Sequence, residues 1–410
     1  MKILLLCANH APEQTGTGKY QGEMAAWLAA QGHEVRVVAA PPYYPAWKVA
    51  QTYKSWLYRR EKLDGCTVYR VPLYVPAKPT GLKRLVHLAS YAASSFPLCL
   101  WLGLVWRPDA LLVTEPTLMV TPAALCAGLL GGARTYLHVQ DFEVDAAFQL
   151  GLLKKPWLYR LALKIERFIM RRFTGVSTIS PNMRKKLLEK GVEASRAFLI
   201  PNWSNVEAFD PAKGPGSWAE RFKKDPSTIL VVYSGNLGNK QGLETLVQTA
   251  RILQNESHLH FIISGDGAAR PMMEEQAQGL SNLTFLPVQP MEAFVHLMIA
   301  ADIHMLPQKA GAADLVMPSK LCNILASGRP VVAGAAQGTQ VYDAVQGCGL
   351  AVEPENAASF ADAILTLAKD GALRAQMGAQ GRAHAQAELS KAPLLCRMER
   401  MLAGEAQTAF

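Results

Sequence analysis

Residues 229–242 read ILVVYSGNLGNKQG, an apolar strand-like run followed by a loop with glycines at positions 235, 238 and 242. A short apolar run that ends in turn residues is typical of a buried strand in a parallel sheet. The pattern returns at residues 259–267, which read LHFIISGDG. In such sheets ligands bind outside the carboxyl ends of the strands, where glycine lets the backbone approach closely. The repetition predicts an α/β domain with a ligand site at these loops.

A helix start in the same half has the character of an anion site. Residues 317–321 read MPSKL, and Pro318 suits the first helical position. Lys320 then lies in the first turn, where the helix dipole disfavours a cation unless an anion is bound there. Asn323 follows Lys320 by three residues and Ser319 by four, so all three share a helix face. With the two glycine loops, this start predicts a nucleotide site. A merely solvated lysine is the alternative.

Strand-like runs alternate with helical segments along the whole chain. The runs are residues 2–7, 35–40, 68–71, 110–113, 135–139 and 176–179, then 229–233, 259–264, 303–306 and 331–333. Turn residues between 201 and 226 separate the two series. The sequence therefore predicts α/β architecture with two Rossmann-like, doubly wound parallel-sheet domains facing a cleft, residues 1–200 and 201–389. A C-terminal helix near 390–410 is expected to pack back on the first domain.

Composition narrows the class of protein. The 410 residues are 50% hydrophobic and 18% charged, which excludes a mostly disordered chain. Seven cysteines without a C-x-x-C pair indicate reduced thiols of a cytoplasmic protein. The first apolar run, residues 3–8, is too short for a secretory signal.

Charge is unevenly distributed. Residues 1–200 carry 26 Lys and Arg against 13 Asp and Glu, whereas residues 201–410 carry 16 against 20. The basic half is expected to meet an anionic partner, such as a membrane surface or a phosphorylated substrate. Nucleic acid is not expected, because no binding module or aromatic-basic stripe is present.

Two segments of the first half bear on membranes. Residues 85–105 carry no formal charge and approach the length of a span, but they contain three serines, a histidine and Pro97, which favours a packed or surface helix. Residues 154–173 separate into a basic helix face, Arg160, Lys164, Arg167 and Arg171, and an apolar face, Leu161, Ile165, Phe168 and Ile169. We expect the first domain to dock on the inner face of the cytoplasmic membrane without spanning it. A helix that packs its apolar face on the sheet is the alternative.

The loop Gly16-Thr17-Gly18-Lys19 enters the first helix. It is not a P-loop, because Glu13 occupies the position of the first glycine and Tyr20 follows the lysine. Nor is it a dinucleotide fingerprint, since residues 8–15 separate it from the first strand. Backbone N–H groups of Gly16 and Gly18 can still bind a phosphate. A tight turn alone is the other interpretation.

Taken in order, these motifs resemble GT-B-fold glycosyltransferases of family 4 over nearly the whole chain. The resemblance is carried by the first glycine loop, GHEV at 32–35, IPN at 200–202, GDG at 265–267 and ASGRPVV at 326–332. Residues 235–242 and 318–321 are further similar to colanic-acid-type fucosyltransferases of exopolysaccharide assembly. The resemblance implies a retaining transfer of fucose from GDP-fucose to a lipid-pyrophosphate-linked oligosaccharide, with neither a cofactor nor a metal.

The resemblance also implies that the donor binds the second domain and the acceptor the first. The candidate donor-binding residues are Gly16, Gly18, Gly235, Asn236, Lys240, Gly265, Gly267, Asp314, Ser319, Lys320 and Asn323. Glu115 and Asp141 end strand-like runs and are the candidate catalytic carboxylates, placed to steady positive charge at the anomeric carbon or to bind sugar hydroxyls. A helix cap is the alternative role for Asp141.

Several family positions differ here. The arginine and lysine that commonly hold the diphosphate read Asn236 and Gln241, with a lysine displaced to 240. The paired glutamates read Leu315 and Asn323, and the frequent histidine before Glu-Pro reads Thr114. Contacts to the phosphate, the ribose and the sugar must therefore be supplied differently.

Other chemistries remain open from the sequence. Asp141, Glu143 and Asp145 would point to one side of an extended chain and would suit Mg²⁺ or Mn²⁺. We expect no metal, because lysines are available for the diphosphate. A nucleotide-sugar epimerase or hydrolase of the same fold and a non-enzymatic nucleotide-sugar-binding protein are the alternative functions.

Overall fold

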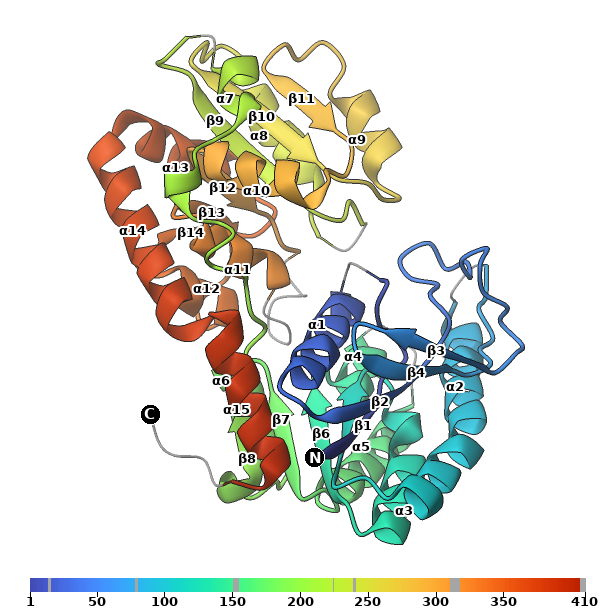
Figure 1. The fold of residues 1–410 in the computed structure, drawn as a ribbon. Helices are drawn as coiled ribbons and strands as arrows, with labels where there is room; N and C mark the ends of the chain where they lie inside the picture. The colour runs from blue at the N-terminus through green and yellow to red at the C-terminus, as the bar shows by residue number, and fades with distance from the viewer. Residues whose placement is uncertain are drawn as a thin grey trace. The chain divides into compact units, whose positions relative to one another are not determined.

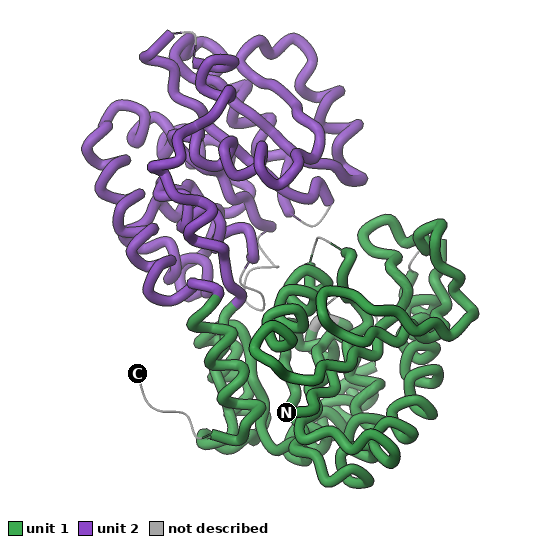
Figure 2. Tube along the Cα trace, in the orientation of Figure 1, with its two compact units in different colours: residues 1–201, 392–410 green, residues 202–391 purple. Residues whose placement is uncertain are grey.

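The computed structural model describes residues 1–13, 16–77, 80–149, 155–223, 225–238, 241–309 and 318–405. The chain divides into two compact units, which Figure 2 colours separately. Unit 1 comprises Met1–Pro201 and Ala392–Phe410, and unit 2 comprises Asn202–Lys391. Each unit alternates strands and helices around one mainly parallel sheet (Figure 1). The expected architecture of two parallel-sheet α/β domains is confirmed.

Unit 1 contains an eight-stranded sheet in the order β3-β4-β2-β1-β5-β6-β7-β8. Its strands are β1 (Lys2–Leu6), β2 (Glu34–Ala39), β3 (Arg59–Leu63), β4 (Cys66–Arg70), β5 (Ala110–Glu115), β6 (Arg134–Val139), β7 (Gly175–Thr178) and β8 (Ala197–Leu199). All pairings are parallel except the edge hairpin β3-β4, which turns at Asp64-Gly65 with both residues at positive φ. The sequence did not predict β3, because this exposed edge strand reads RREKL and lacks an apolar run.

The helices of unit 1 connect these strands. They are α1 (Gly16–Ala30), α2 (Gly81–Trp101), α3 (Thr121–Gly131), α4 (Glu143–Gln149), α5 (Pro156–Met170) and α6 (Pro181–Glu189). The strand order β5-β6-β7-β8 and right-handed crossovers place α3, α5 and α6 on one face of the sheet and α1 on the other. The last helix, α15 (Lys391–Ala403), contacts unit 1 through Arg397 Nη1, which donates to the Leu199 carbonyl at 3.3 Å.

Helix α2 contains most of the uncharged run at 85–105 and continues as a π-helical turn, Leu102–Trp106. Within the described residues, Gly81–Trp106 is the one helix whose length and hydropathy would suffice for a membrane span. One face packs inside unit 1: the Tyr91 hydroxyl donates to the Val38 carbonyl at 2.8 Å, and His87 Nδ1 lies 2.6 Å from the Tyr74 carbonyl. Only 28% of the apolar window is buried, so the remaining faces are largely exposed.

Unit 2 contains a six-stranded parallel sheet in the order β11-β10-β9-β12-β13-β14. Its strands are β9 (Ile229–Ser234), β10 (Leu259–Ser264), β11 (Leu283–Leu286), β12 (Ile303–Leu306), β13 (Val331–Gly334) and β14 (Gly349–Val352). Its helices are α7 (Ser217–Phe222), α8 (Glu244–Ile252), α9 (Arg270–Gln276), α10 (Met291–Ala300), α11 (Ser319–Ala326), α12 (Gln340–Val345), α13 (Ala357–Lys369) and α14 (Gly371–Glu388). The sequence did not predict the short edge strands β11 and β14, which are only partly buried.

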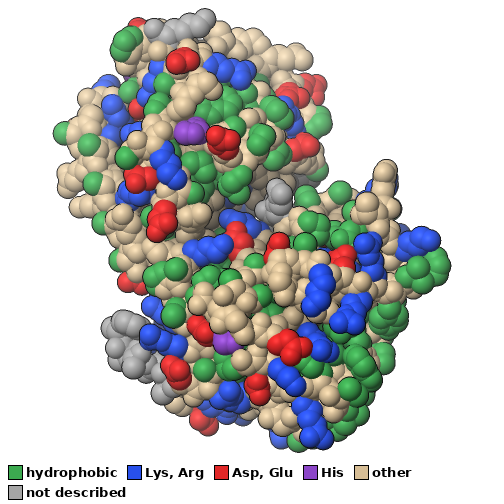
Figure 3. Space-filling view, viewed as in Figure 1, with side chains coloured by type: hydrophobic (Ala, Val, Ile, Leu, Met, Phe, Trp, Pro, Cys, Tyr) green, Lys and Arg blue, Asp and Glu red, His purple; other side chains and the backbone are tan. Residues whose placement is uncertain are grey.

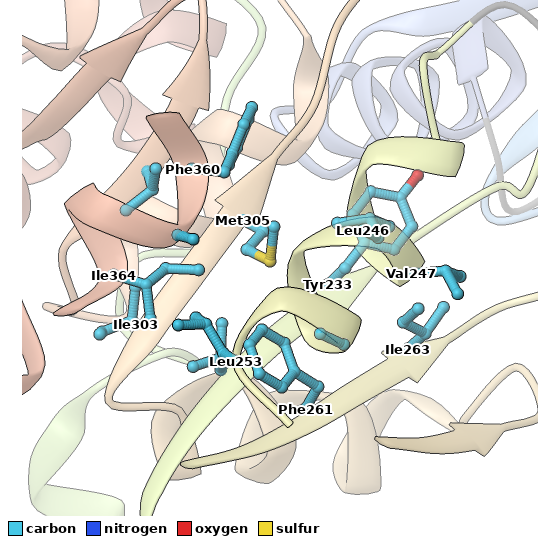
Figure 4. Close-up of a cluster of buried hydrophobic side chains, with 14 of the residues drawn as sticks. Tyr233, Leu246, Val247, Leu253, Phe261, Ile263, Ile303, Met305, Phe360 and Ile364 are labelled. Carbon is cyan, nitrogen blue, oxygen red and sulfur yellow. The ribbon is translucent and has the colours of Figure 1, made fainter. Parts of the chain in front are cut away.

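A dense core fixes the carboxyl ends of the central strands in unit 2. Tyr233 on β9, Phe261 on β10 and Met305 on β12 are each 2% exposed (Figure 4). Leu246 of α8 and Phe360 of α13 cover this side of the sheet. Burying a large apolar side chain contributes about 1.5–3 kcal/mol. The core therefore holds the strand ends, and with them the loops that follow, in one arrangement.

Candidate active site

The loops after β9 and β10 meet the start of α11 at the carboxyl edge of the unit 2 sheet. Strand β9 lies between β10 and β12, so the chain direction across the sheet reverses beside it. Such a switch point is where open α/β sheets bind ligands. Of the predicted residues, Gly235, Gly265, Gly267 and Lys320 lie together here. Lys240 and Asp314 lie outside the described residues.

At Gly265 and Gly267 backbone packs directly on backbone, and at Gly235 the Lys320 side chain lies against the backbone. A Cβ on Gly235 would lie 2.2 Å from Lys320 Cε, and a Cβ on Gly265 would lie 1.9 Å from the Gly235 carbonyl oxygen. A Cβ on Gly267 would lie 2.4 Å from the Leu237 carbonyl oxygen. All three glycines also have positive φ. The sequence predicted that these glycines lie in ligand-binding loops. The structure shows that Gly235 also packs against the Lys320 side chain.

Lys320 is held by polar groups that carry no charge. Its Nζ donates to the Tyr233 hydroxyl and, at 2.8 Å, to Gln241 Oε1, and it lies 4.5 Å from the centre of the Tyr233 ring. The Tyr233 hydroxyl in turn donates to the Asn236 carbonyl at 2.9 Å. Gln241, which stands where the family has a lysine, thus accepts a hydrogen bond from Lys320. No pattern in the sequence indicated the Tyr233 contact.

The environment of Lys320 favours an incoming anion. Within the described residues Lys320 forms no ion pair. Burial without a counter-charge lowers the pKa of Lys320 to about 7. Helix α11 begins at Ser319, with Pro318 as its N-cap residue, so Lys320 is the second helical residue. A phosphate at this position would meet both the ammonium group and free backbone N–H groups.

Asn323 lies one turn further along α11. Its Oδ1 accepts a hydrogen bond of 2.8 Å from the Ser204 hydroxyl. One polar atom of this side chain is thus engaged within unit 2. A role for Asn323 in ribose binding stays a prediction.

In unit 1 the entry to α1 is built over a buried carboxylate. Glu13 Oε1 accepts hydrogen bonds from the backbone N–H groups of Tyr43 (2.9 Å) and Tyr44 (2.8 Å), and Oε2 accepts one from Asn9 Nδ2 (2.9 Å). A Cβ on Gly18 would lie 2.8 Å from Glu13 Oε2. Gly18 therefore has a packing role at this turn. Phosphate binding by Gly16 and Gly18 stays a prediction.

Three carboxyl groups gather at the carboxyl ends of β5 and β6. Glu115 is fully buried, and neither of its carboxyl oxygens has a hydrogen-bond partner among the described residues. Burial raises the pKa of Glu115 well above its usual range, and the nearby Glu143 and Asp141 raise it further. An isolated buried carboxylate is very costly, so burial favours the neutral acid form of Glu115. Its influence on a ligand would be exerted through the neighbouring carboxyl groups.

Glu143 is the carboxyl group that sequence reasoning did not select as catalytic. It is the first residue of α4, and its Oε2 accepts a hydrogen bond of 2.5 Å from the Leu118 backbone N–H. Burial raises the pKa of Glu143 to about 7, which suits an acid or base at neutral pH. Asp141 lies partly exposed in the preceding turn. A catalytic role for Asp141 or Glu115 stays a prediction.

The alternating carboxylates 141, 143 and 145 do not form one ligand set. Helix α4 begins at Glu143, so the extended geometry that would align them is lost. Asp145 is paired with Lys186 (2.8 Å) and Lys190 (2.7 Å). In the part of the chain that the structure describes, no group of three or more His, Cys, Asp or Glu side chains is placed to hold a metal ion.

Sequence relatives agree with this geometry. Residues 15–203 match the family described as "Glycosyl transferase 4-like domain", and residues 217–384 match "Glycosyl transferases group 1". A protein of Escherichia coli K12 named as the colanic acid biosynthesis glycosyl transferase WcaI is 45% identical over 366 residues, covering 87% of this chain and 89% of the relative.

Solved structures show the same fold. HepE of Anabaena in complex with UDP has a TM-score of 0.71 at 15% identity, over 98% of this chain and 100% of that one. WaaG, a glycosyltransferase involved in lipopolysaccharide biosynthesis, has a TM-score of 0.67 at 16% identity, over 98% and 100% of the two chains. The chain therefore belongs to the family 4 glycosyltransferases of the GT-B fold, with a colanic-acid-type enzyme among its relatives, and it is a glycosyltransferase.

Proposed function

We propose that this glycosyltransferase moves fucose from GDP-fucose to a lipid-pyrophosphate-linked oligosaccharide during assembly of a colanic-acid-like exopolysaccharide, with retention at the anomeric carbon. The relative named for colanic acid biosynthesis, 45% identical over 87% of this chain, supports the pathway. The resemblance of residues 235–242 and 318–321 to fucosyltransferases supports the sugar and the stereochemistry. The observation that carries a nucleotide-sugar donor is Lys320, a lysine held at a helix start without a carboxylate partner among the described residues.

The donor diphosphate is proposed to lie at the start of α11. Lys320 Nζ and backbone N–H groups of the first turn would meet the phosphate oxygens, next to Gly235, which packs against the Lys320 side chain. In the transition state the diphosphate gains negative charge as the sugar leaves. Fixed donors at that position stabilise this charge, which is the main contribution expected of the protein.

The acceptor is proposed to bind unit 1. The carboxyl groups of Glu143 and Asp141 lie at the carboxyl edge of the sheet, beside the switch point between β1 and β5. Carboxyl groups there can accept hydrogen bonds from sugar hydroxyls and steady positive charge at the anomeric carbon. The protonation of Glu143 is controlled by burial, as described above.

The reaction is proposed to take place at the cytoplasmic face of the inner membrane, with the enzyme attached peripherally. A lipid-linked acceptor resides in that membrane. Residues 1–200 carry 26 Lys and Arg against 13 Asp and Glu. This positive charge favours attachment to anionic lipid. The buried contacts of α2 with unit 1 favour a packed helix over a span.

A panel of nucleotide sugars, each incubated with the enzyme and a bacterial lipid extract, tests the function. Fucose transfer from GDP-fucose to an extractable lipid-linked glycan is expected. Lys320→Ala should raise the donor KM by about ten- to a hundredfold, because a hydrogen bond to a charged group contributes about 1.5–3 kcal/mol. Lys369→Ala, at an exposed lysine of α13, is the matched control.

Four results would contradict the proposal. Transfer of another sugar would show that fucose is not the sugar this enzyme transfers. A free or epimerised sugar without a lipid product would indicate an epimerase or hydrolase, and donor binding without turnover would indicate a binding protein. Unchanged donor KM in Lys320→Ala would place the diphosphate elsewhere.

A further inference from the structure

Helix α5 is attached to unit 1 along one side only. Glu166 and Met170 are its buried residues. The Glu166 carboxylate pairs with Lys190 Nζ, which also binds Asp145 Oδ2 at 2.7 Å. Lys190 lies 5.0 Å from the centre of the fully buried Phe142 ring. These contacts set the rotation of α5 about its axis, and the rest of its circumference faces outward.

An apolar stripe runs along that outward side. Its members are 46–59% exposed and recur at helical spacing: Trp157, Leu161, Ile165 and Phe168. The sequence left open whether this face packs on the sheet, and the structure shows that most of it does not. Large contiguous apolar surface on a soluble domain marks an interaction site.

A basic row lies beside the apolar stripe, about a quarter of a helical turn away. Its members, all exposed, are Arg160, Lys164, Arg167 and Arg171. Across the described ranges of the chain, none of the four forms an ion pair. The row therefore presents four charges to an external partner.

Two hollows adjoin the basic row. The first, of about 390 Å³, is lined by Lys164, Arg167, Phe168, Arg171 and Arg172. The second, of about 260 Å³, is lined by Arg171, Gly191, Val192, Glu193 and Arg196. In the first hollow the Arg172 guanidinium lies 4.6 Å from the centre of the Phe168 ring, so cation and apolar ring form one surface. A hollow with several unpaired cations suits a phosphate headgroup.

We propose that the outward side of α5 docks on an anionic lipid bilayer, with the apolar stripe entering the acyl boundary and the basic row and its first hollow holding lipid phosphates. The combination of a narrow apolar stripe and an adjacent basic row is that of a helix lying in a membrane interface. This deepens the proposed function by naming the surface that meets the membrane.

A bilayer fits this surface better than a second copy of the chain. A twofold contact through α5 would bring one basic row against the other, and like charges would repel. On the same face of the sheet, α3 also exposes Leu129 (86%) and Leu130 (44%). The edge of unit 1 that carries α2 also shows hydrophobic side chains (Figure 3), and Trp101, Leu104 and Val105 are exposed there, but residues 85–105 contain no Lys or Arg.

Co-sedimentation of the full chain with vesicles, without donor or acceptor, tests this surface independently of catalysis. The vesicles contain either phosphatidylglycerol and phosphatidylethanolamine or phosphatidylcholine alone. The variants are Leu161→Gln/Ile165→Gln/Phe168→Gln for the stripe and Arg160→Glu/Lys164→Glu/Arg167→Glu for the row. The matched control is Leu104→Gln/Val105→Gln/Trp101→Gln on the α2 edge. Donor KM confirms folding, because all these positions are exposed and lie in unit 1.

Wild type is expected to bind anionic vesicles and to be released by high salt. A basic residue near the surface is worth about fivefold in affinity, so reversal of three should weaken binding at least a hundredfold. The stripe variant should lose at least tenfold, and the α2 control should stay within about threefold of wild type. Wild-type vesicle affinity in both α5 variants would overturn the proposal. The proposal would also be overturned if wild type bound neutral and anionic vesicles equally, or if only the α2 control variant lost vesicle binding. A wild-type dimer that the stripe variant converts to monomers would overturn it as well. Failure of fucose transfer alone would leave it standing.

Discussion

Binding of the nucleotide sugar should take up a proton at Lys320. Burial among neutral groups lowers the pKa of this ammonium to about 7, so at pH 7 about half of the free enzyme molecules carry the charge. A diphosphate beside Nζ favours the charged form and returns the pKa toward its ordinary value of 10.5. The complex thus keeps the proton between pH 7 and 10, whereas the free enzyme loses it. Donor affinity must therefore fall as the pH rises through this window.

The size of the effect follows from the protonated fraction of the free enzyme. With a pKa of about 7, that fraction falls from about one half at pH 7 to about one hundredth at pH 9. If only the charged form binds, the apparent Kd of the donor rises about fiftyfold over these two units. The Tyr233 hydroxyl beside Nζ does not titrate here, because burial raises its pKa further.

Calorimetry of donor binding measures this linkage. At pH 7, titrations in buffers of different ionisation enthalpy should show uptake of about half a proton per donor bound, and at pH 8.5 close to one. A nucleotide sugar is preferred to a free nucleoside diphosphate, whose terminal phosphate titrates near pH 6. Lys320→Arg, which keeps its charge, should show no uptake and a nearly flat pH dependence. Absence of uptake in wild type, or full uptake in Lys320→Met, would refute the role assigned to Lys320.

Three further changes test other parts of the site. Gly235→Ala puts a Cβ 2.2 Å from Lys320 Cε and should displace that side chain. We therefore expect the donor KM to rise at least tenfold and the thermal unfolding midpoint to drop. An unchanged KM would show that Lys320 is not displaced. With a pKa of about 7, Glu143 changes its charge between pH 6 and 8, so Glu143→Gln should flatten the pH profile of kcat/KM for the acceptor, measured at saturating donor so that Lys320 stays charged. Glu115→Gln, which keeps the neutral form that burial favours, should leave the wild-type profile; the reverse pattern would exchange the two roles. EDTA should leave the transfer rate within about twofold, and a loss restored by Mg²⁺ would revive metal binding near Asp141.

Apolar patterning made the central strands predictable. Strands β9 and β10 are continuous apolar runs because both of their faces are buried, so their position could be predicted from the chain alone. Strand β3 lies at a sheet edge, where exposed positions accept polar residues, and it reads RREKL, so the apolar pattern disappears. Edge strands β11 and β14 have only four residues each and are only partly buried, so the apolar pattern there is too short to be clear. For α5, helical spacing in the sequence predicted an apolar face and a basic face. It could not show which of these faces would be exposed in the folded domain.

The site residues divide in a similar way. Lys320 could be selected from its place in the first turn of a helix, because the conflict with the helix dipole is a local property. Its partners Tyr233 and Gln241 could not, since they meet it only when the β9 loop folds over α11. Glu143 could not be selected for another reason: its pKa depends on burial and on the hydrogen bond from the Leu118 backbone N–H, which is 25 residues away in the chain.

By itself, then, the sequence determined the two α/β domains, the glycine loops at the strand ends, the cation at the start of α11 and the amphipathic character of α5. These features depend on periodicity and on local backbone chemistry, which neighbouring residues in the chain specify. Only the tertiary structure decided that Lys320 lacks a carboxylate partner among the described residues, that Glu115 is a fully buried carboxyl group, and that the apolar stripe of α5 faces outward. Counter-charge, desolvation and exposure are set by residues distant in the chain, and packing alone brings those residues together.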